Sequence, residues 1–251
     1  MEVIPITTPR VEINPKGQLS DWISQHLGAR NLNLQEGDIL VVTSKLVSYF
    51  EQRVVDLSTV QVSDQAKKYA EKNGHPAPIM QLVIDEADQI LAETTLVLLT
   101  KKNKIYCPNA GVDTSNVLKG YAVLWPEQPF QFAQDLRHAF MKAFALKKIA
   151  VIISDSMCVP GRSGTTAVAI GYAGISGFQN LKGAKDLFGN TLRYSALNLV
   201  DSAATAANLV MGEAAESTPL AIVRNLSWEA QSQTKNDEMI ITPSDELYPL
   251  E

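Results

Sequence analysis

A continuous run of apolar residues, Ile149–Ile153, constrains the fold more than any other feature of the sequence. A strand that is apolar at every position has no face to offer to water, so other layers must cover both of its faces. A chain of 251 residues is long enough to supply those layers, either as one large domain or as two closely packed lobes. Because Ser154-Asp155-Ser156 follows the run directly, the sequence predicts an acidic side chain held at the C-terminal end of a buried strand.

The remaining elements are predicted from hydrophobic periodicity and from capping residues, and the chain has no internal repeat and no low-complexity linker. Predicted helices cover residues 19–27, 64–74, 78–88, 130–148 and 201–212, and predicted strands cover residues 39–42, 96–99, 105–107 and 149–153. Ser63 and Asp201 are the expected N-caps of two of these helices, while Gly74 and Gly212 are their expected ends. Residues 231–251 are polar, which predicts a loose tail.

Composition excludes several classes of protein. Twenty-two Lys and Arg against 27 Asp and Glu leave a charge of -5, so no overall cationic field attracts a nucleic acid. No apolar run approaches the roughly 20 residues of a membrane helix, and residues 1–10 do not resemble a secretory signal. We therefore expect a soluble, cytoplasmic protein without a nucleic-acid or membrane partner.

The cysteines and histidines are too few for a disulfide framework or a four-ligand zinc site. Cys107 and Cys158 both lie beside apolar strands and have no histidine nearby in the sequence, so they are predicted to be buried thiols rather than nucleophiles. His138, on the predicted helix 130–148, is expected to be a surface or packing residue.

Three acidic residues stand at the ends of predicted elements or in a turn motif: Asp113, Asp155 and Glu213. Magnesium and manganese prefer carboxylate, carbonyl and water ligands, and such ligands need not be neighbours in the sequence. If the three converge, they form a site for a divalent metal. The alternative interpretation is that each makes only local hydrogen bonds in a cap or turn.

Two segments have residues suited to anion binding. The loop 160–166 is rich in small residues whose backbone N–H groups can surround an anion, with Arg162 as a forked donor and Gly164 as a flexible position. It lacks the lysine of a Walker A loop, and an ordinary turn is the alternative. Ser44 and Lys45 follow the predicted strand 39–42, where Lys45 can meet a phosphate or remain solvated.

Taken together, several motifs resemble the coenzyme F420-0:L-glutamate ligase (F420-0:gamma-glutamyl ligase) family in both order and spacing. The resemblance runs from near residue 1 to about Leu226. Its most specific part is Asn109-Ala-Gly-Val-Asp-Thr-Ser-Asn116. The other segments that carry it are residues 36–45, Ser154-Asp-Ser156, Ala169-Ile-Gly171, Lys185-Asp-Leu-Phe-Gly189 and Asn208-Leu-Val-Met-Gly-Glu213.

The resemblance implies an α+β fold with mixed and antiparallel sheets and flanking helices. It implies one ligase-like domain over residues 1–251, which divides into two intimate lobes if a boundary falls near residue 147, and assembly as a homodimer. The implied reaction uses GTP to convert a substrate carboxylate into an acyl phosphate, which the amine of L-glutamate then attacks to form an amide.

The motif match also assigns roles to individual residues. Asp113, Asp155 and Glu213 become ligands of Mg²⁺ or Mn²⁺, and Asp155 and Arg162 become the catalytic pair. Ser44, Lys45, Ser156 and Gly164 become contacts to the nucleotide.

The sequence also departs from the family pattern at positions that usually carry basic side chains. Tyr49, Val159 and Asn190 occupy three of them, and Glu51-Gln-Arg53 lacks the usual glycine. Each lost charge-assisted hydrogen bond is worth about 1.5 to 3 kcal/mol, so these changes predict weaker binding of a triphosphate and weak or absent turnover of coenzyme F420-0. They leave the identity of the acceptor open, and it need not be coenzyme F420-0. Two alternatives to a ligase stay open at this point: another metal-dependent phosphate-processing enzyme, and a catalytically silent ligand-binding dimer.

Overall fold

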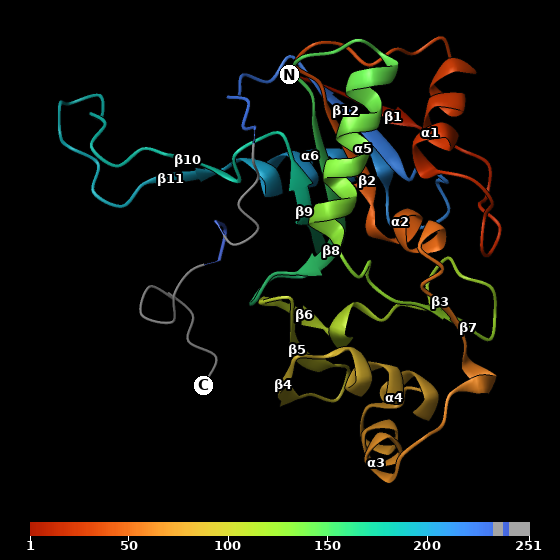
Figure 1. Ribbon diagram of the computed structural model, residues 1–251. Coiled ribbons are helices and arrows are strands. Elements are labelled where there is room, and N and C mark those ends of the chain that lie inside the picture. Colours follow the sequence, from red (N-terminus) through yellow and green to blue (C-terminus); the bar gives the residue numbers. More distant parts are fainter. Residues whose placement is uncertain (233–237, 241–251) are drawn as a thin grey trace.

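A computed structural model describes residues 1–232 and 238–240, and it is built around a five-stranded sheet (Figure 1). The strands are ordered β1-β12-β2-β8-β9, where β2 and β8 are parallel and every other pair is antiparallel. Their bounds are β1 Glu2–Ile6, β2 Ile39–Thr43, β8 Ala150–Cys158, β9 Thr165–Ala173 and β12 Leu220–Arg224. A mixed sheet of this kind confirms the α+β class.

Helices cover both faces of this sheet, as the apolar run predicted. One core contains Leu40 and Val42 of β2 together with side chains from α1 (Leu19–Gly28), α2 (Ser44–Phe50) and α5 (Pro129–Ala143). The opposite core contains Ile39 and Val41 of β2 together with the small side chains of α6 (Leu199–Met211). Consecutive strand residues point to opposite faces, so β2 contributes to both cores.

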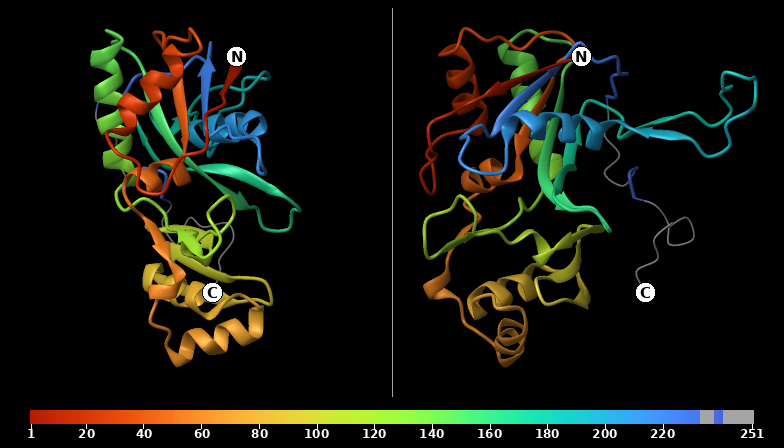
Figure 2. Two further views of the ribbon diagram at one scale, coloured as in Figure 1. Left: turned by 90° about the vertical axis from the view of Figure 1, so that its right-hand side faces the viewer. Right: turned by 180° about the vertical axis from the view of Figure 1, so that it is seen from behind.

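Residues 54–124 form a separate layer below the main sheet, with an apolar cluster of their own (Figures 1 and 2). Small sheets β4-β5-β6 and β3-β7 pack there with two helices. The bounds are β3 Val54–Asp56, η1 Leu57–Thr59, α3 Asp64–Asn73, α4 Ala77–Glu86, β4 Gln89–Glu93, β5 Leu98–Lys102, β6 Ile105–Pro108, η2 Asn109–Gly111 and β7 Tyr121–Val123. The division into two lobes near residue 147 stays a prediction.

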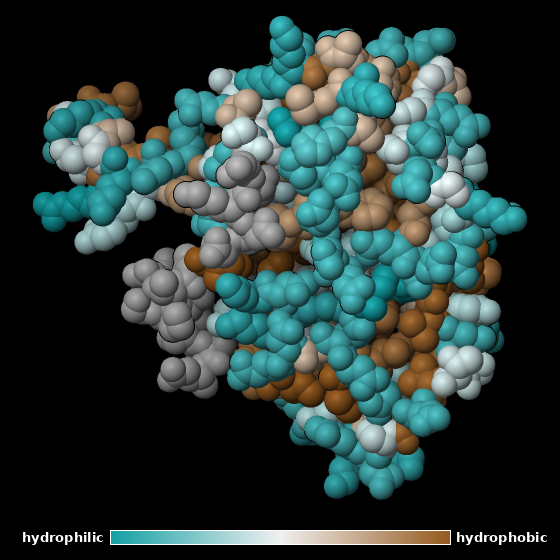
Figure 3. Space-filling view, viewed as in Figure 1, coloured by the Kyte–Doolittle hydropathy of each residue, from teal (hydrophilic) through white to brown (hydrophobic). Residues whose placement is uncertain are grey.

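An arm projects from the body between β10 (Phe178–Asn180) and β11 (Ala196–Asn198), as the right-hand view of Figure 2 shows. Three large apolar side chains on it are almost wholly exposed: Leu187 at 100%, Phe188 at 90% and Tyr194 at 93%. Hydrophobic atoms are visible at the outer end of the arm in Figure 3.

Several predicted boundaries are confirmed, among them the Ser63 cap and the left-handed Gly74 at the two ends of α3. The predicted helix 130–148 is too long at its C-terminal end. α5 ends at Ala143, and Ala145 then adopts a φ of 54°, which breaks the helical path. The backbone N–H groups of Lys147 and Lys148 donate instead to the Glu36 carboxylate.

Three further predictions need correction. Asp155 lies inside β8 rather than after its end, because the strand continues to Cys158 beyond a bulge at Ile153/Ser154. The N-cap of α6 is Asn198, whose side chain accepts from the backbone N–H of Asp201, so Asp201 lies in the first turn. Cys107 is buried as predicted, whereas Cys158 at the end of β8 is exposed.

The predicted loose tail, residues 231–251, falls mostly outside the described residues. Among residues 1–232 and 238–240, no helix combines the length and apolar character needed to span a membrane.

Candidate functional site

A cavity of about 550 Å³ opens where β2 and β8 run side by side toward the lower layer. Because the two strands are parallel, Thr43 and Ser154 pair at the same edge, and the residues after them meet there. The charged and hydroxyl-bearing side chains of the lining include Arg10, Ser44, Lys45, Tyr49, Asp113, Ser115, Asp155, Ser156, Glu213 and Glu216. Six of the eight site residues predicted from the sequence therefore line one cavity.

The start of α2 positions two of these residues. Thr43 caps the helix by accepting from the backbone N–H of Leu46 at 3.3 Å, so the chain turns from strand to helix without a loop. The first two helical residues are Ser44 and Lys45. The Ser44 hydroxyl donates to Oδ1 of Asp155 at 2.7 Å.

Asp155 is enclosed by donors on both carboxylate oxygens. Oδ1 accepts from Ser44, and Oδ2 accepts from the indole N–H of Trp125 at 2.6 Å. Burial raises the pKa of Asp155 to about 6, although both hydrogen bonds and Lys45 act in the opposite direction. Near neutral pH this carboxylate is ionised but close to its pKa, which suits a group that binds a metal or accepts a proton.

A left-handed turn in the lower layer positions Asp113. Asn109, Ala110 and Gly111 have φ values of 50°, 51° and 72°, a conformation that glycine and asparagine tolerate better than other residues. Side-chain hydrogen bonds hold the turn, since Leu98 N–H donates to Asn109 Oδ1 and Ala110 N–H donates to Thr100 Oγ1. The most specific motif of the sequence therefore encodes a backbone shape.

Gly111 also explains why Trp125 can approach Asp155. A Cβ atom added to Gly111 would lie 2.4 Å from the indole ring, so only glycine leaves room for it. Asp113 is held next to β7, which ends two residues before Trp125, because its backbone exchanges two hydrogen bonds with Val123 at 3.0 and 2.8 Å. Sequence reasoning missed Trp125, and its only local signal was an aromatic residue closing the short apolar stretch 122–125.

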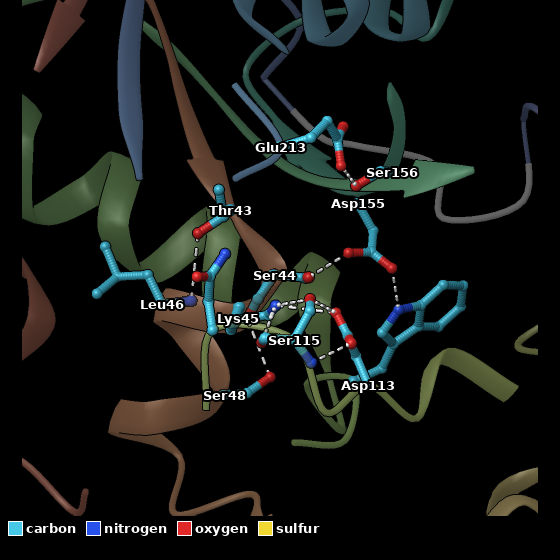
Figure 4. Close-up of polar contacts among 12 residues, drawn as sticks. Thr43, Ser44, Lys45, Leu46, Ser48, Asp113, Ser115, Asp155, Ser156 and Glu213 are labelled. Carbon is cyan, nitrogen blue, oxygen red and sulfur yellow. Dashed lines mark hydrogen bonds and ion pairs between the residues drawn. The ribbon is translucent and has the colours of Figure 1, made fainter. Parts of the chain in front are cut away.

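Asp113 and Lys45 form an ion pair of 2.8 Å across the cavity wall (Figure 4). The Lys45 ammonium also donates to the backbone oxygen of Ser115 at 2.7 Å and to its hydroxyl at 3.0 Å, so all three of its hydrogens have partners. Burial alone would raise the pKa of Asp113, but Lys45 and the Ser115 donors outweigh it and hold this pKa below its usual value.

Glu213 lies on the other side of Asp155, as Figure 4 shows. It accepts from the Ser156 hydroxyl at 3.1 Å and from the Asn208 side chain at 2.8 Å. Asn116, at the end of the turn motif, donates to the backbone oxygen of Ala214 at 2.6 Å and so connects the two acidic walls. Within the described part of the chain, no three His, Cys, Asp or Glu side chains are grouped closely enough to hold a metal ion as they stand.

Arg162 and Gly164 are placed elsewhere. Both lie in the turn between β8 and β9, where Gly164 has a φ of 88°, and neither is among the residues lining the cavity. Their predicted roles in catalysis and nucleotide binding stay predictions.

The fold and site together describe an enzyme, because carboxylates, hydroxyl groups and a lysine from distant segments face one cavity at the edge of a mixed sheet. Comparison with known sequences specifies the class. A sequence model described as F420-0:Gamma-glutamyl ligase matches residues 6–225. This chain belongs to that family and is a ligase.

Similar proteins from three archaea carry the name coenzyme F420:L-glutamate ligase. The protein from Methanocaldococcus jannaschii is 36% identical over 225 residues, which cover 89% of this chain and 87% of the relative. A relative from Methanococcus maripaludis is 35% identical and covers 90% of this chain and 88% of its own length. The Methanopyrus kandleri protein is 31% identical over 99% of this chain and 97% of its own.

Proposed function

We propose that this protein is a GTP- and divalent-metal-dependent γ-glutamyl ligase, which joins L-glutamate to a substrate carboxylate through an amide bond. The observation that carries the proposal is the convergence of Ser44, Lys45, Asp113, Asp155 and Glu213 on one cavity from four separate segments of the chain. The acceptor need not be coenzyme F420-0, although the similar proteins are named for that coenzyme.

The donor chemistry of the cavity suits a hard cation. Asp113, Asp155 and Glu213 offer carboxylate oxygens, and Ser156 offers a hydroxyl, which is the ligand set that Mg²⁺ and Mn²⁺ prefer. Since these groups are not clustered in advance, substrate phosphates would complete the shell around the ion. When bound, the metal would neutralise charge on the phosphate oxygens.

The residues of the chain itself have distinct tasks in the proposed reaction. Lys45 is placed to leave Asp113 and donate to the transferred phosphoryl group, because its ammonium lies at the cavity wall. The γ-phosphoryl of GTP moves to the acceptor carboxylate, giving an acyl phosphate and GDP. The amine of L-glutamate then attacks the acyl carbon, and phosphate leaves. When Asp155 is not bound to the metal, it can accept the proton that the amine loses, because burial raises its pKa.

Product analysis tests this function. The protein is incubated with GTP, Mn²⁺ and L-glutamate, either with coenzyme F420-0 or with other carboxylate acceptors, and mass spectrometry detects any glutamylated product. From the missing basic side chains we expect weak or absent turnover of coenzyme F420-0 and retained binding of GTP with Mn²⁺. Turnover of coenzyme F420-0 at about 1 s⁻¹ or faster would refute the first expectation. Failure to bind any nucleotide with Mn²⁺ would refute the second.

We also propose that the protein is a homodimer in which the β10–β11 arm contacts the second copy. The support is the exposure of Leu187, Phe188 and Tyr194, since large apolar side chains gathered on one exposed segment mark contact surfaces. Light scattering should give twice 27.4 kDa for the wild-type chain, and Phe188→Ser together with Leu187→Ser should shift it toward the monomer. A wild-type mass near 27.4 kDa would contradict the proposal.

A further inference from the structure

The cavity contains a second basic side chain, which the sequence motifs did not indicate. Arg10, in the segment after β1, lines the cavity together with Lys45. Lys45 is fully engaged by Asp113 and Ser115. In the part of the chain that the structure describes, the Arg10 guanidinium has no hydrogen bond and no ion pair, and the side chain is exposed. Its positive charge is therefore available to a ligand.

The backbone just before Arg10 is held firmly although the side chain is free. Thr8 N–H donates to the backbone oxygen of Ser217 at 2.8 Å, and the Ser217 hydroxyl donates to the backbone oxygen of Thr8 at 2.8 Å. Both residues line the cavity. Glu216, an acidic residue of the same lining, accepts from the backbone N–H of Ala214 at 2.8 Å.

Tyr49 lies within electrostatic reach of Arg10 and also lines the cavity. Its side chain is only 7% exposed, yet no described residue forms a hydrogen bond with its hydroxyl group. The hydroxyl is not among the buried polar atoms that lack a partner, so it reaches open space although the ring is buried, and at the cavity wall it can donate to a ligand.

Helical geometry places Tyr49 next to Lys45, which is proposed to contact the transferred phosphoryl group. Lys45 and Tyr49 are four residues apart on α2 and so share one face, with Cβ atoms about 5 to 6 Å apart. Arg10 and Tyr49 thus line the same cavity as the Lys45–Asp113 pair, and Arg10, unlike Lys45, forms no ion pair with a described carboxylate.

We propose that Arg10 and Tyr49 form an oxyanion subsite in this cavity, which binds a carboxylate or phosphate group of a substrate. The guanidinium supplies two parallel N–H donors and the phenol supplies one O–H donor, which together match a group with two or three oxygens. This inference rests on the proposed function only for the identity of the substrates. The subsite would compensate in part for the missing basic side chains. Tyr49 occupies a position that is usually basic in the family, and Arg10 supplies a positive charge to the same cavity from a different segment of the chain.

Arginine footprinting tests the subsite on the wild-type protein. Phenylglyoxal modifies exposed arginines, and peptide mass spectrometry follows Arg10 and Arg30 separately. Arg30 is the matched control, since it is exposed, lies outside the cavity lining, and its side chain donates only to the His26 carbonyl of the preceding helix α1. The probes are L-glutamate, inorganic tripolyphosphate in EDTA, and GTP with Mn²⁺.

We expect at least one saturating probe to slow modification of Arg10 at least fivefold while Arg30 reacts at an unchanged rate. Protection by L-glutamate identifies a carboxylate subsite, and protection by tripolyphosphate or GTP identifies a phosphate subsite. No protection of Arg10 by any of the three probes would overturn the proposal. The L-glutamate and tripolyphosphate experiments need neither metal nor amide formation. Protection of Arg10 can therefore be observed even if the protein is not a ligase, and protection can be absent even if ligation is observed.

Two variants then assign the contacts. Calorimetry with the protecting probe should show affinity reduced about tenfold for Arg10→Gln and severalfold for Tyr49→Phe, with no change for Arg30→Gln. Thermal unfolding of each variant confirms that it is folded. Equal affinities for the wild-type protein and for Arg10→Gln would also overturn the proposal.

Discussion

Replacing Gly111 by alanine should destabilise the protein and disturb the candidate site together. Gly111 has a φ of 72°, and an added Cβ would overlap the Trp125 indole, whose nearest ring atoms lie at 2.4 Å. The indole is 2% exposed and its N–H is the donor to Asp155 Oδ2, so it has no free space to move into without breaking that hydrogen bond.

Two separable terms set the size of the effect. A left-handed backbone costs an L-residue about 1 to 2 kcal/mol relative to glycine. Overpacking a dense core costs about 1 to 3 kcal/mol more. The sum, about 2 to 5 kcal/mol, corresponds to a fall in Tm of about 4 to 20 °C for a chain of this size.

Gly120→Ala is the matched control, because Gly120 has a φ of 91° but nothing within 4 Å of the added Cβ. It should lose only the backbone term. Urea unfolding of both variants gives the difference, which we expect to be about 1 to 3 kcal/mol in favour of Gly120→Ala. Near-ultraviolet circular dichroism should change for Gly111→Ala alone, since only there is an indole displaced. Equal losses in the two variants would show that the contact with Trp125 has no energetic importance.

Three further outcomes are expected. Burial raises the pKa of Asp155 to about 6 in the folded chain, so the wild-type free energy of unfolding should fall by an amount on the order of 2 to 3 kcal/mol as the pH rises from about 4 to 6 in EDTA. Asp155→Asn should lack this fall, and parallel pH profiles for the two proteins would argue against the assignment. Burial raises the pKa of the Cys107 thiol to about 11, so a thiol reagent at pH 8 should label only Cys158 in the folded protein, a result that peptide mapping checks. Glu86→Gln should cost about 3 to 5 kcal/mol in urea unfolding, because it leaves Arg53 and Lys102 without their shared carboxylate, whereas Asp64→Asn in an exposed pair should change little.

The elements that the sequence predicted well are those whose pattern is local. The buried run at Ile149–Ile153 needed no tertiary information, since only two covering layers can satisfy it. The helix Asp64–Asn73 could also be predicted from the sequence alone, because Ser63 and Gly74 mark its two ends. The end of α5 was missed because the competing interaction, Glu36 with the backbone of Lys147 and Lys148, comes from more than 100 residues away in the sequence.

The site divides in the same way. Motif matching found Asp113, Asp155 and Glu213, since each is embedded in a distinctive local pattern. It missed Arg10 and Trp125, because their importance depends on which neighbours the folded chain brings to them. That the Lys45 ammonium pairs with Asp113 was likewise beyond the reach of spacing arguments, since the two residues are 68 positions apart.

The position of β1 in the sheet has a consequence for how the protein is made. Among the described residues, β1 pairs only with β12, and β12 separates it from β2, so β1 has no partner strand until β12 has been synthesised. At about 5 to 20 residues per second, the roughly 200 residues between them take about 10 to 40 s to synthesise. Residues 54–124 can pack around their own apolar cluster during that interval. Glu213 also joins the cavity late in translation. A nascent chain released before residue 224 would therefore present unpaired edges at β1 and β2, and such edges invite aggregation.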